Sequence, residues 1–165
     1  MKTLLILRHA KAEPPDEGMS DFDRPLAPRG RKDAPRVGEW LLAQGLQPHA
    51  ILSSDAQRAK STARLVAEAC DFEGELQLFH SLYMAMPETY IETVCAAAEE
   101  ADRVLVVGHN PTLDDLLFLL TGSHDGFPTA GLAVVDLDVA SWCDVRLPTK
   151  HKLSHFVRGK ELPHD

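Results

Sequence analysis

Two arginines and two histidines in this chain are placed where a phosphoryl group could be bound and attacked. Arg8 and His9 come directly after an aliphatic run, and Arg58 and His109 each follow a similar run further along the chain. A guanidinium offers planar, paired donors to phosphoryl oxygens, and a neutral imidazole is a competent nucleophile. These four side chains therefore predict phosphoryl chemistry, provided that the fold brings them to one place.

The runs that precede these side chains are typical of buried strands. Residues 4–7 are four consecutive aliphatic residues, and residues 50–53 and 104–107 are similar. In an open α/β sheet, the carboxyl ends of the strands form the edge at which ligands bind. We therefore expect the two arginines and the two histidines to converge at one edge of a sheet.

Helical and extended segments alternate along the chain. Helices are expected over 31–44, 55–69, 87–98 and 112–120, and strands over 3–7, 50–53, 76–79, 103–107, 131–138 and 142–147. Pro35 fits the first helix only if it lies in the first turn. The alternation predicts a three-layer α/β/α sandwich with a mostly parallel central sheet, formed by one domain over residues 1–165.

Turn and cap residues set the expected helix starts. The second helix is expected to start near Asp55, with Ser53 or Ser54 as its cap. Pro87 suits the first turn of the third helix, and Asn110 is expected to cap the fourth.

Composition narrows the class of protein. A net charge of −8 argues against a general nucleic-acid or anionic-membrane binder, and no apolar run approaches the ~20 residues that span a bilayer. The residues before the first predicted strand are not typical of a leader, so we expect no leader segment. Cys70, Cys95 and Cys143 are odd in number and widely spaced, so we expect free thiols in a reducing compartment, the cytoplasm.

Several segments resemble one family. Residues 4–10 resemble the opening strand and Arg-His-Gly motif of the histidine phosphatase superfamily, which has the phosphoglycerate-mutase-like fold. Two later elements of that superfamily, Ser-Pro-x-x-Arg-Ala-x-x-Thr-Ala and the one with the second catalytic histidine, are similar to residues 53–63 and 107–111. Residues 23–30 narrow the resemblance to the SixA-type phosphohistidine phosphatase branch, and residues 129–133 and 153–156 are similar to it as well. The resemblance covers essentially the whole chain.

The chain departs from the family pattern at two positions. Ala10 stands where the first motif has glycine, and Ser54-Asp55 stands where the second has Ser-Pro. Neither change removes a catalytic side chain. Asp55 would weaken phosphate binding if it pointed inward, but at a helix N-terminus we expect it to face solvent.

The resemblance implies a role for each of the four residues. His9 would attack phosphorus and form a phosphohistidine intermediate, while its other ring nitrogen donates to a backbone carbonyl after the strand. Arg8 and Arg58 would bind the phosphoryl oxygens, and a protonated His109 would stabilise them from the opposite side. The implied reaction uses no metal and no cofactor.

Three further residues have two readings each. Arg24 resembles an arginine of the SixA-type branch that could contact the phosphate, but it could equally pair with Asp21 or Asp23. Asn110 could bind substrate or cap a helix. Glu88 is a possible general acid, and a glutamate in a first helical turn is also a common partner of the helix dipole.

Metal binding has little support in the sequence. His151 and His155 are four residues apart and could meet on one helix face, but no third ligand is evident beside them. Asp114 and Asp115 lie near His109, yet only one of them can face the site from a helix. We expect no metal.

Three functions remain open. The first is a phosphohistidine phosphatase acting on a signalling or phosphotransfer protein, such as a histidine phosphotransfer domain. The second is a phosphomonoesterase for a small phosphorylated metabolite, and the third is a non-catalytic phosphate-binding or phosphoprotein-binding module. An imidazole leaves phosphorus more easily than an alkoxide, so a missing general acid would favour the first function.

Overall fold

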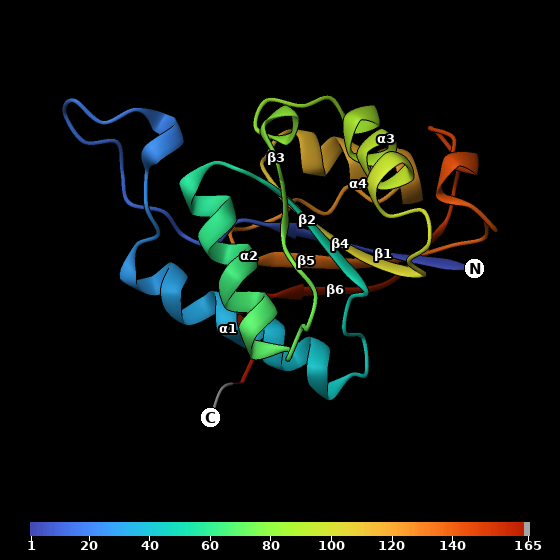
Figure 1. Ribbon diagram of the computed structural model, residues 1–165, viewed down its shortest axis with the longest axis horizontal. Helices are drawn as coiled ribbons and strands as arrows, with labels where there is room; N and C mark the ends of the chain where they lie inside the picture. Colours follow the sequence, from blue (N-terminus) through green and yellow to red (C-terminus); the bar gives the residue numbers. More distant parts are fainter. Residues whose placement is uncertain (164–165) are drawn as a thin grey trace.

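The computed structural model, described for residues 1–163, has a six-stranded sheet at its centre (Figure 1). The strands lie in the order β3-β2-β4-β1-β5-β6. Neighbouring strands among the first four are parallel, whereas β5 is antiparallel to both β1 and β6. This arrangement confirms the predicted α/β class with a mostly parallel sheet. The strand bounds are β1 Lys2–Arg8, β2 Ala50–Ser54, β3 Gln77–Phe79, β4 Arg103–Gly108, β5 Gly131–Leu137 and β6 Lys152–Arg158.

The sheet lies between two pairs of helices, with α1 and α2 on one face and α3 and α4 on the other (Figure 1). In β1, Leu5 and Leu7 pack towards α1 and α2, whereas Leu4 and Ile6 pack towards α3 and α4. Burial on both faces explains why this strand is an unbroken aliphatic run. The helix bounds are α1 Pro28–Ala43, α2 Gln57–Ala69, α3 Pro87–Ala97 and α4 Thr112–Thr121, and four short 3-10 helices are η1 Asp21–Asp23, η2 His80–Leu82, η3 Trp142–Asp144 and η4 Gly159–Glu161.

Two predicted helix starts were wrong. α1 begins at Pro28, so Pro35 lies inside the helix and not in its first turn. A proline there removes one backbone hydrogen bond, and the buried face that includes Val37 and Leu41 offsets the loss. α2 begins at Gln57, two residues after the predicted start, and no side chain caps it.

The last predicted strand was also wrong. Residues 142–147 form η3 and a loop, and the sixth strand is β6, ten residues later. Trp142 explains the difference, because its indole is fully buried against the α3–α4 side and its Nε1–H donates to the Ala101 carbonyl at 2.6 Å. The buried indole fixes residues 142–147 against the α3–α4 face of the sheet, so this segment does not pair with a strand.

The expectation of three free thiols was wrong for two of them. Cys95 of α3 and Cys143 of η3 form a disulfide across a sequence separation of 48, whereas Cys70 is free and buried. Closing a loop of this length stabilises a fold by about 2–4 kcal/mol. The thiol argument for a reducing compartment therefore no longer holds for Cys95 and Cys143. Within residues 1–163, no helix combines the length and the apolar character needed to cross a bilayer.

Candidate active site

The carboxyl ends of β1 and β4 place two histidines side by side. The backbone N–H of His9 donates to the Gly108 carbonyl at 3.1 Å, which continues the β1–β4 register one residue past the strand. His109 follows Gly108, and the ring centroids of the two histidines are 5.2 Å apart. Arg8 and Arg58 lie close enough to both rings for their charges to lower both histidine pKa values. The structure thus brings together the four residues that the sequence singled out.

His9 is held as a neutral imidazole with one free nitrogen. Its side chain is buried, and Nδ1 lies 2.8 Å from the carbonyl oxygen of Ala10. A carbonyl can only accept, so Nδ1 carries the proton and Nε2 keeps its lone pair. The expected backbone carbonyl is therefore confirmed. Burial lowers the pKa of His9 to about 3, and the nearby His109, Arg58 and Arg8 act in the same direction.

His109 is also buried, and one of its nitrogens has no partner. Nε2 lies 2.8 Å from the hydroxyl of Ser54, at the end of the neighbouring strand β2. Nδ1 is buried without a hydrogen-bond partner among residues 1–163. Burial and then the charge of Arg58 lower the pKa of His109 to about 4, so the ring is neutral at pH 7. An anion bound beside it would favour the protonated ring.

Ser54 is a site residue that sequence reasoning assigned to another task. It was expected as a helix cap, but α2 has no side-chain cap. The Ser54 hydroxyl contacts His109 and also accepts from the backbone N–H of Ala56, before the helix, at 3.2 Å. The adjacency of β2 and β4 in the sheet is the signal that could have revealed this contact.

Arg8 and Asn110 meet at one backbone carbonyl. Arg8 Nη1 and Asn110 Nδ2 each donate to the Phe127 carbonyl at 3.0 Å. Asn110 does not cap α4, whose N-cap is Pro111 and which has no side-chain cap. Arg8 Nε and Asn110 Oδ1 are buried without partners in the described part of the chain, which leaves a donor and an acceptor for a bound group.

Arg58 extends from α2 to a carboxylate on η1. Its Nη1 donates to the Asp21 carbonyl at 2.7 Å, and its Nη2 donates to Asp21 Oδ2 at 2.9 Å. The same carboxylate accepts from Tyr83 Oη at 2.6 Å and from Arg24 Nη1 at 2.9 Å. The Tyr83 hydroxyl first, and then the two arginines, hold the pKa of Asp21 well below its usual range.

This network includes one of the two contacts predicted for Arg24. Its predicted ion pair with Asp21 is confirmed, and Arg24 Nε also donates to the Glu13 carbonyl at 2.9 Å. Sequence reasoning missed Tyr83, whose ring meets His109 edge-on with centroids 5.6 Å apart. Nothing local marks Tyr83, because it lies 62 residues from Asp21.

Thr62 joins the segment after β1 to Arg58. Its hydroxyl accepts from the backbone N–H of Ala10 at 3.0 Å and donates to the Arg58 carbonyl at 2.7 Å. Ala10 is fully buried, so the methyl that replaces the family's glycine fits within the packing. The helix of Arg58 and the segment after β1 are therefore held at a fixed separation.

Two acidic residues lie apart from this arrangement. Glu88 is exposed and lines a surface cavity of about 280 Å³ with Ile91, Cys95 and Trp142. Among residues 1–163, no hydrogen bond or ion pair joins it to the two histidines or to Arg8 or Arg58. Asp55 faces His80, with its two carboxylate oxygens 3.1 and 3.2 Å from Nδ1.

The residues considered for metal binding have other surroundings. His151 precedes β6 and His155 lies on it, 5.2 Å from Trp40 between ring centroids, so the two do not share a helix face. Asp114 Oδ1 accepts from the backbone N–H of Phe127 at 2.8 Å. Within the described residues, the one cluster of three potential ligands is Cys95, Glu99 and Cys143, whose two sulfurs are bonded to each other.

Known proteins resemble this chain in sequence. Residues 4–81 match the model of the histidine phosphatase superfamily (branch 1). An uncharacterized protein of Mycobacterium tuberculosis is 35% identical over 150 residues, which are 84% of this chain and 91% of the relative. An uncharacterized protein of Mycobacterium leprae is 33% identical over 164 residues, covering 92% of this chain and 99% of the relative.

Solved structures resemble it as well. The "putative phosphohistidine phosphatase SixA" of Agrobacterium tumefaciens is 31% identical with a TM-score of 0.80, over 94% of this chain and 97% of that one. The protein histidine phosphatase SixA complexed with tungstate shares the fold at 22% identity and a TM-score of 0.81, over 96% and 97% of the two chains. Together with the paired histidines at the sheet edge, these similarities assign the chain to the histidine phosphatase superfamily, in its SixA-type branch, and make it a phosphatase.

Proposed function

We propose that the protein is a phosphohistidine phosphatase that uses His9 as its nucleophile. The observation that carries the proposal is the state of His9, which is neutral, keeps Nε2 unprotonated and lies beside His109 and the charges of two arginines. A phosphoryl group bound by those arginines would meet a nucleophile that needs no prior deprotonation.

The reaction has two steps. In the first, Nε2 of His9 bonds to phosphorus while the bond from phosphorus to the substrate imidazole breaks. The leaving nitrogen keeps the electron pair and takes a proton from water, and the hydroxide that remains takes up the proton released by the attacking water in the second step. The contact from Nδ1–H to the Ala10 carbonyl strengthens as the His9 ring gains positive charge. In the second step, water attacks phosphorus, the bond to Nε2 breaks and neutral His9 returns with free phosphate.

Donors around the ring would stabilise the transferred group. Arg8 Nε and His109 Nδ1 are buried nitrogens without partners in residues 1–163, so each can meet a phosphoryl oxygen. Arg58 adds a positive charge in a defined position, because the Asp21 carbonyl and carboxylate hold its guanidinium. Oriented cations and N–H donors are the main catalytic device in phosphoryl transfer. These residues supply the nucleophile and the donors to the phosphoryl oxygens, and water supplies the proton. We therefore propose that no metal is required.

The carboxylates near the site support a nitrogen leaving group. Asp21 is held ionised by Tyr83, Arg24 and Arg58, so it cannot supply a proton at neutral pH. Glu88 lines a separate surface cavity. An alkoxide leaving group needs a protein acid far more than an imidazole does. We therefore propose protein phosphohistidine, as on a histidine phosphotransfer domain, as the substrate, in keeping with the SixA-type relatives.

The test measures phosphate release from a histidine-phosphorylated phosphotransfer domain in the presence of EDTA. We expect rapid release by the wild type, none by His9→Ala, and wild-type rates from a matched control, His155→Ala, whose histidine lies on β6 against Trp40. Acid-labile phosphate trapped on His9 would identify the intermediate. Release only from phosphoserine or a small phosphomonoester would make the protein a phosphomonoesterase, and release from neither substrate would leave a binding module.

A further inference from the structure

Positive charge is concentrated at one end of the sequence. Residues 1–64 contain 11 Lys and Arg against 8 Asp and Glu, whereas residues 65–165 contain 6 against 17. The first segment therefore has a net charge of +3 and the second −11, which together give −8. The net charge of the whole chain would repel an acidic partner, so an attractive surface needs a local group of exposed cations, and the first segment has the larger share of them.

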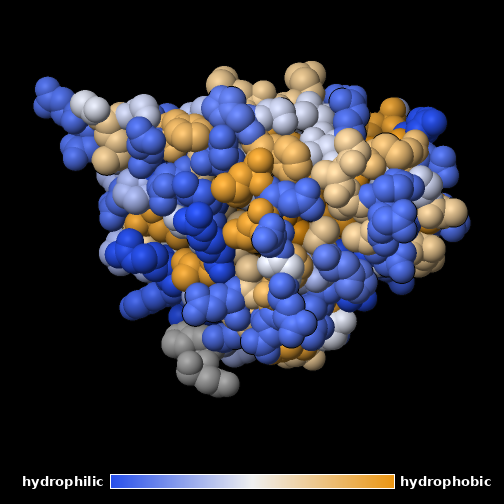
Figure 2. Space-filling view, in the orientation of Figure 1, coloured by the Kyte–Doolittle hydropathy of each residue, from blue (hydrophilic) through white to orange (hydrophobic). Residues whose placement is uncertain are grey.

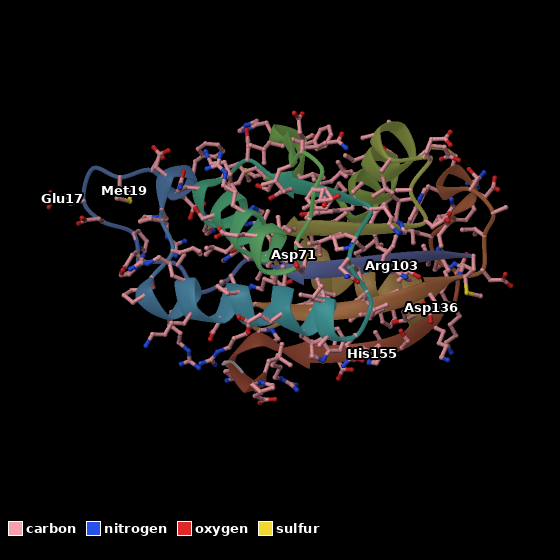
Figure 3. The ribbon with its side chains drawn as sticks, turned by 60° about the horizontal axis from the view of Figure 1, so that its bottom comes forward. Glu17, Met19, Asp71, Arg103, Asp136 and His155 are labelled. Carbon is pink, nitrogen blue, oxygen red and sulfur yellow. A yellow bond between two sulfur atoms is a disulfide. The ribbon has the colours of Figure 1, made fainter. Side chains whose placement is uncertain are left out.

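The first turns of α1 expose cations without exposed acids. Arg29, Arg31 and Lys32 are exposed, and Arg36 is partly exposed. The only acid within residues 28–38, Asp33, is just 4% exposed. Figure 3 shows side chains that end in nitrogen projecting from α1 away from the sheet, and hydrophilic residues cover this corner in Figure 2.

Three of these cations share one cleft. Arg29, Lys32 and Arg36 line a cavity of about 360 Å³ together with Pro28 and Asp33. Asp33 Oδ2 lies 3.5 Å from Arg29 Nε, and its Oδ1 lies 3.6 Å from Arg36 Nη1. One buried carboxylate thus pairs with two of the three cations. The cleft keeps a net positive charge of two and can accept anionic side chains.

The start of α1, which carries the cationic cleft, packs against the segment that follows His9. The backbone N–H of Ala27, directly before α1, donates to the Lys11 carbonyl at 2.9 Å. A Cβ atom added to Gly30 would lie only 2.2 Å from the same carbonyl oxygen, so the first turn of α1 packs directly on this segment. Lys11 is exposed and stands two residues after His9.

We propose that Lys11, Arg29, Lys32 and Arg36 form a docking surface for an acidic region of the phosphorylated protein substrate. The inference rests on the proposed function, because only a macromolecular substrate can reach both His9 and α1. Complementary charge would bring an acidic region of the partner to these cations and orient its phosphohistidine towards His9. A small phosphorylated metabolite would enter the site without touching α1.

The test compares one protein substrate with one small substrate. The double variant Arg29→Glu/Lys32→Glu reverses two charges of the cleft, and Lys150→Glu/Lys152→Glu makes the same change outside it. Against a histidine-phosphorylated phosphotransfer domain of net negative charge, we expect KM to rise about tenfold for the first variant, with kcat unchanged. Phosphoramidate hydrolysis should stay at the wild-type rate in both variants. The milder Lys32→Glu leaves both partners of Asp33 intact and should raise KM in the same direction.

Each outcome decides a different question. If the wild type releases no phosphate from the phosphoprotein, the proposed function is wrong, and the docking proposal is wrong with it. A wild type that is active but has the same KM as the cleft variant overturns docking alone. A parallel loss of phosphoramidate hydrolysis would mean that the substitutions damage the site. Binding to anionic lipid vesicles that the cleft variant loses, with an unchanged KM for the phosphoprotein, would reassign the surface to membranes.

Discussion

The candidate site has two halves that are built differently. His9, His109 and Ser54 come from the ends of three neighbouring strands, and each is less than a tenth exposed. Asp21 and Tyr83 come from η1 and the turn after η2, and the Asp21 side chain is 52% exposed. Arg58 is the residue that both halves share, since it is buried on α2 but bonded to Asp21.

The difference in burial gives the two halves different properties, since one holds neutral histidines and the other holds ion pairs in contact with solvent. In the buried half, removal of water lowers the pKa of both histidines and keeps them neutral. In the exposed half, ion pairs in contact with solvent each contribute little to stability, so their geometry matters more than their energy. A phosphorylated protein could approach that half, whereas His9 is buried and held by the Ala10 carbonyl.

Among changes that leave both histidines in place, substitution of the shared residue should have the largest effect. Arg58→Ala removes a charged donor from the phosphoryl group and leaves Asp21 without one of its partners. We expect kcat/KM for phosphohistidine to fall by about 10²–10³-fold, as for loss of one oxyanion donor. Steady-state kinetics with Lys60→Ala, on the same helix, as control would measure it. A fall below tenfold would show that Arg58 does not bind the transferred group.

A change confined to the exposed half should have a smaller effect. Asp21→Asn keeps the shape but removes the charge that orients Arg58 and Arg24, so we expect kcat to fall about tenfold with little change in KM. Asp23→Asn, two residues away, is the control. In an Arg58→Ala background the Asp21 substitution should add nothing. Additive losses would mean that Asp21 does not act through Arg58.

The buried histidines should also make the free energy of unfolding depend on pH, which can be measured without an activity assay. The folded-state pKa values of His9 and His109, about 3 and about 4, lie below the unfolded value of 6.5. The unfolded chain therefore binds more protons, so the free energy of unfolding falls as pH is lowered from 6.5 towards 4. Each histidine contributes up to about 1.4 kcal/mol per pH unit. Urea unfolding of His109→Gln should show the shallower slope, with the exposed His155→Gln as control. Equal slopes in all three proteins would contradict the buried, neutral state.

Sequence reasoning could find the two histidines of the buried half because their signals are local, whereas the role of Ser54 depends on which strands are neighbours. Each strand-end residue follows its own aliphatic run, and parallel strands bring such ends to one edge. The contact between Asp21 and Tyr83 joins two loops 62 residues apart, and no local pattern marks it. The Cys95–Cys143 disulfide and the place of Trp142 likewise depend on how η3 packs against α3. Residues 142–147 have a strand-like composition, and only tertiary packing gives them another conformation.

The close packing at Gly30 has a consequence for turnover. No side chain separates α1 from the Lys11 carbonyl, so the helix and the segment that follows His9 move together. A protein held on the first turns of α1 would keep its phosphorylated side chain within a short and constant reach of the nucleophile. Its effective concentration at His9 would then be set by this geometry and no longer by its concentration in solution.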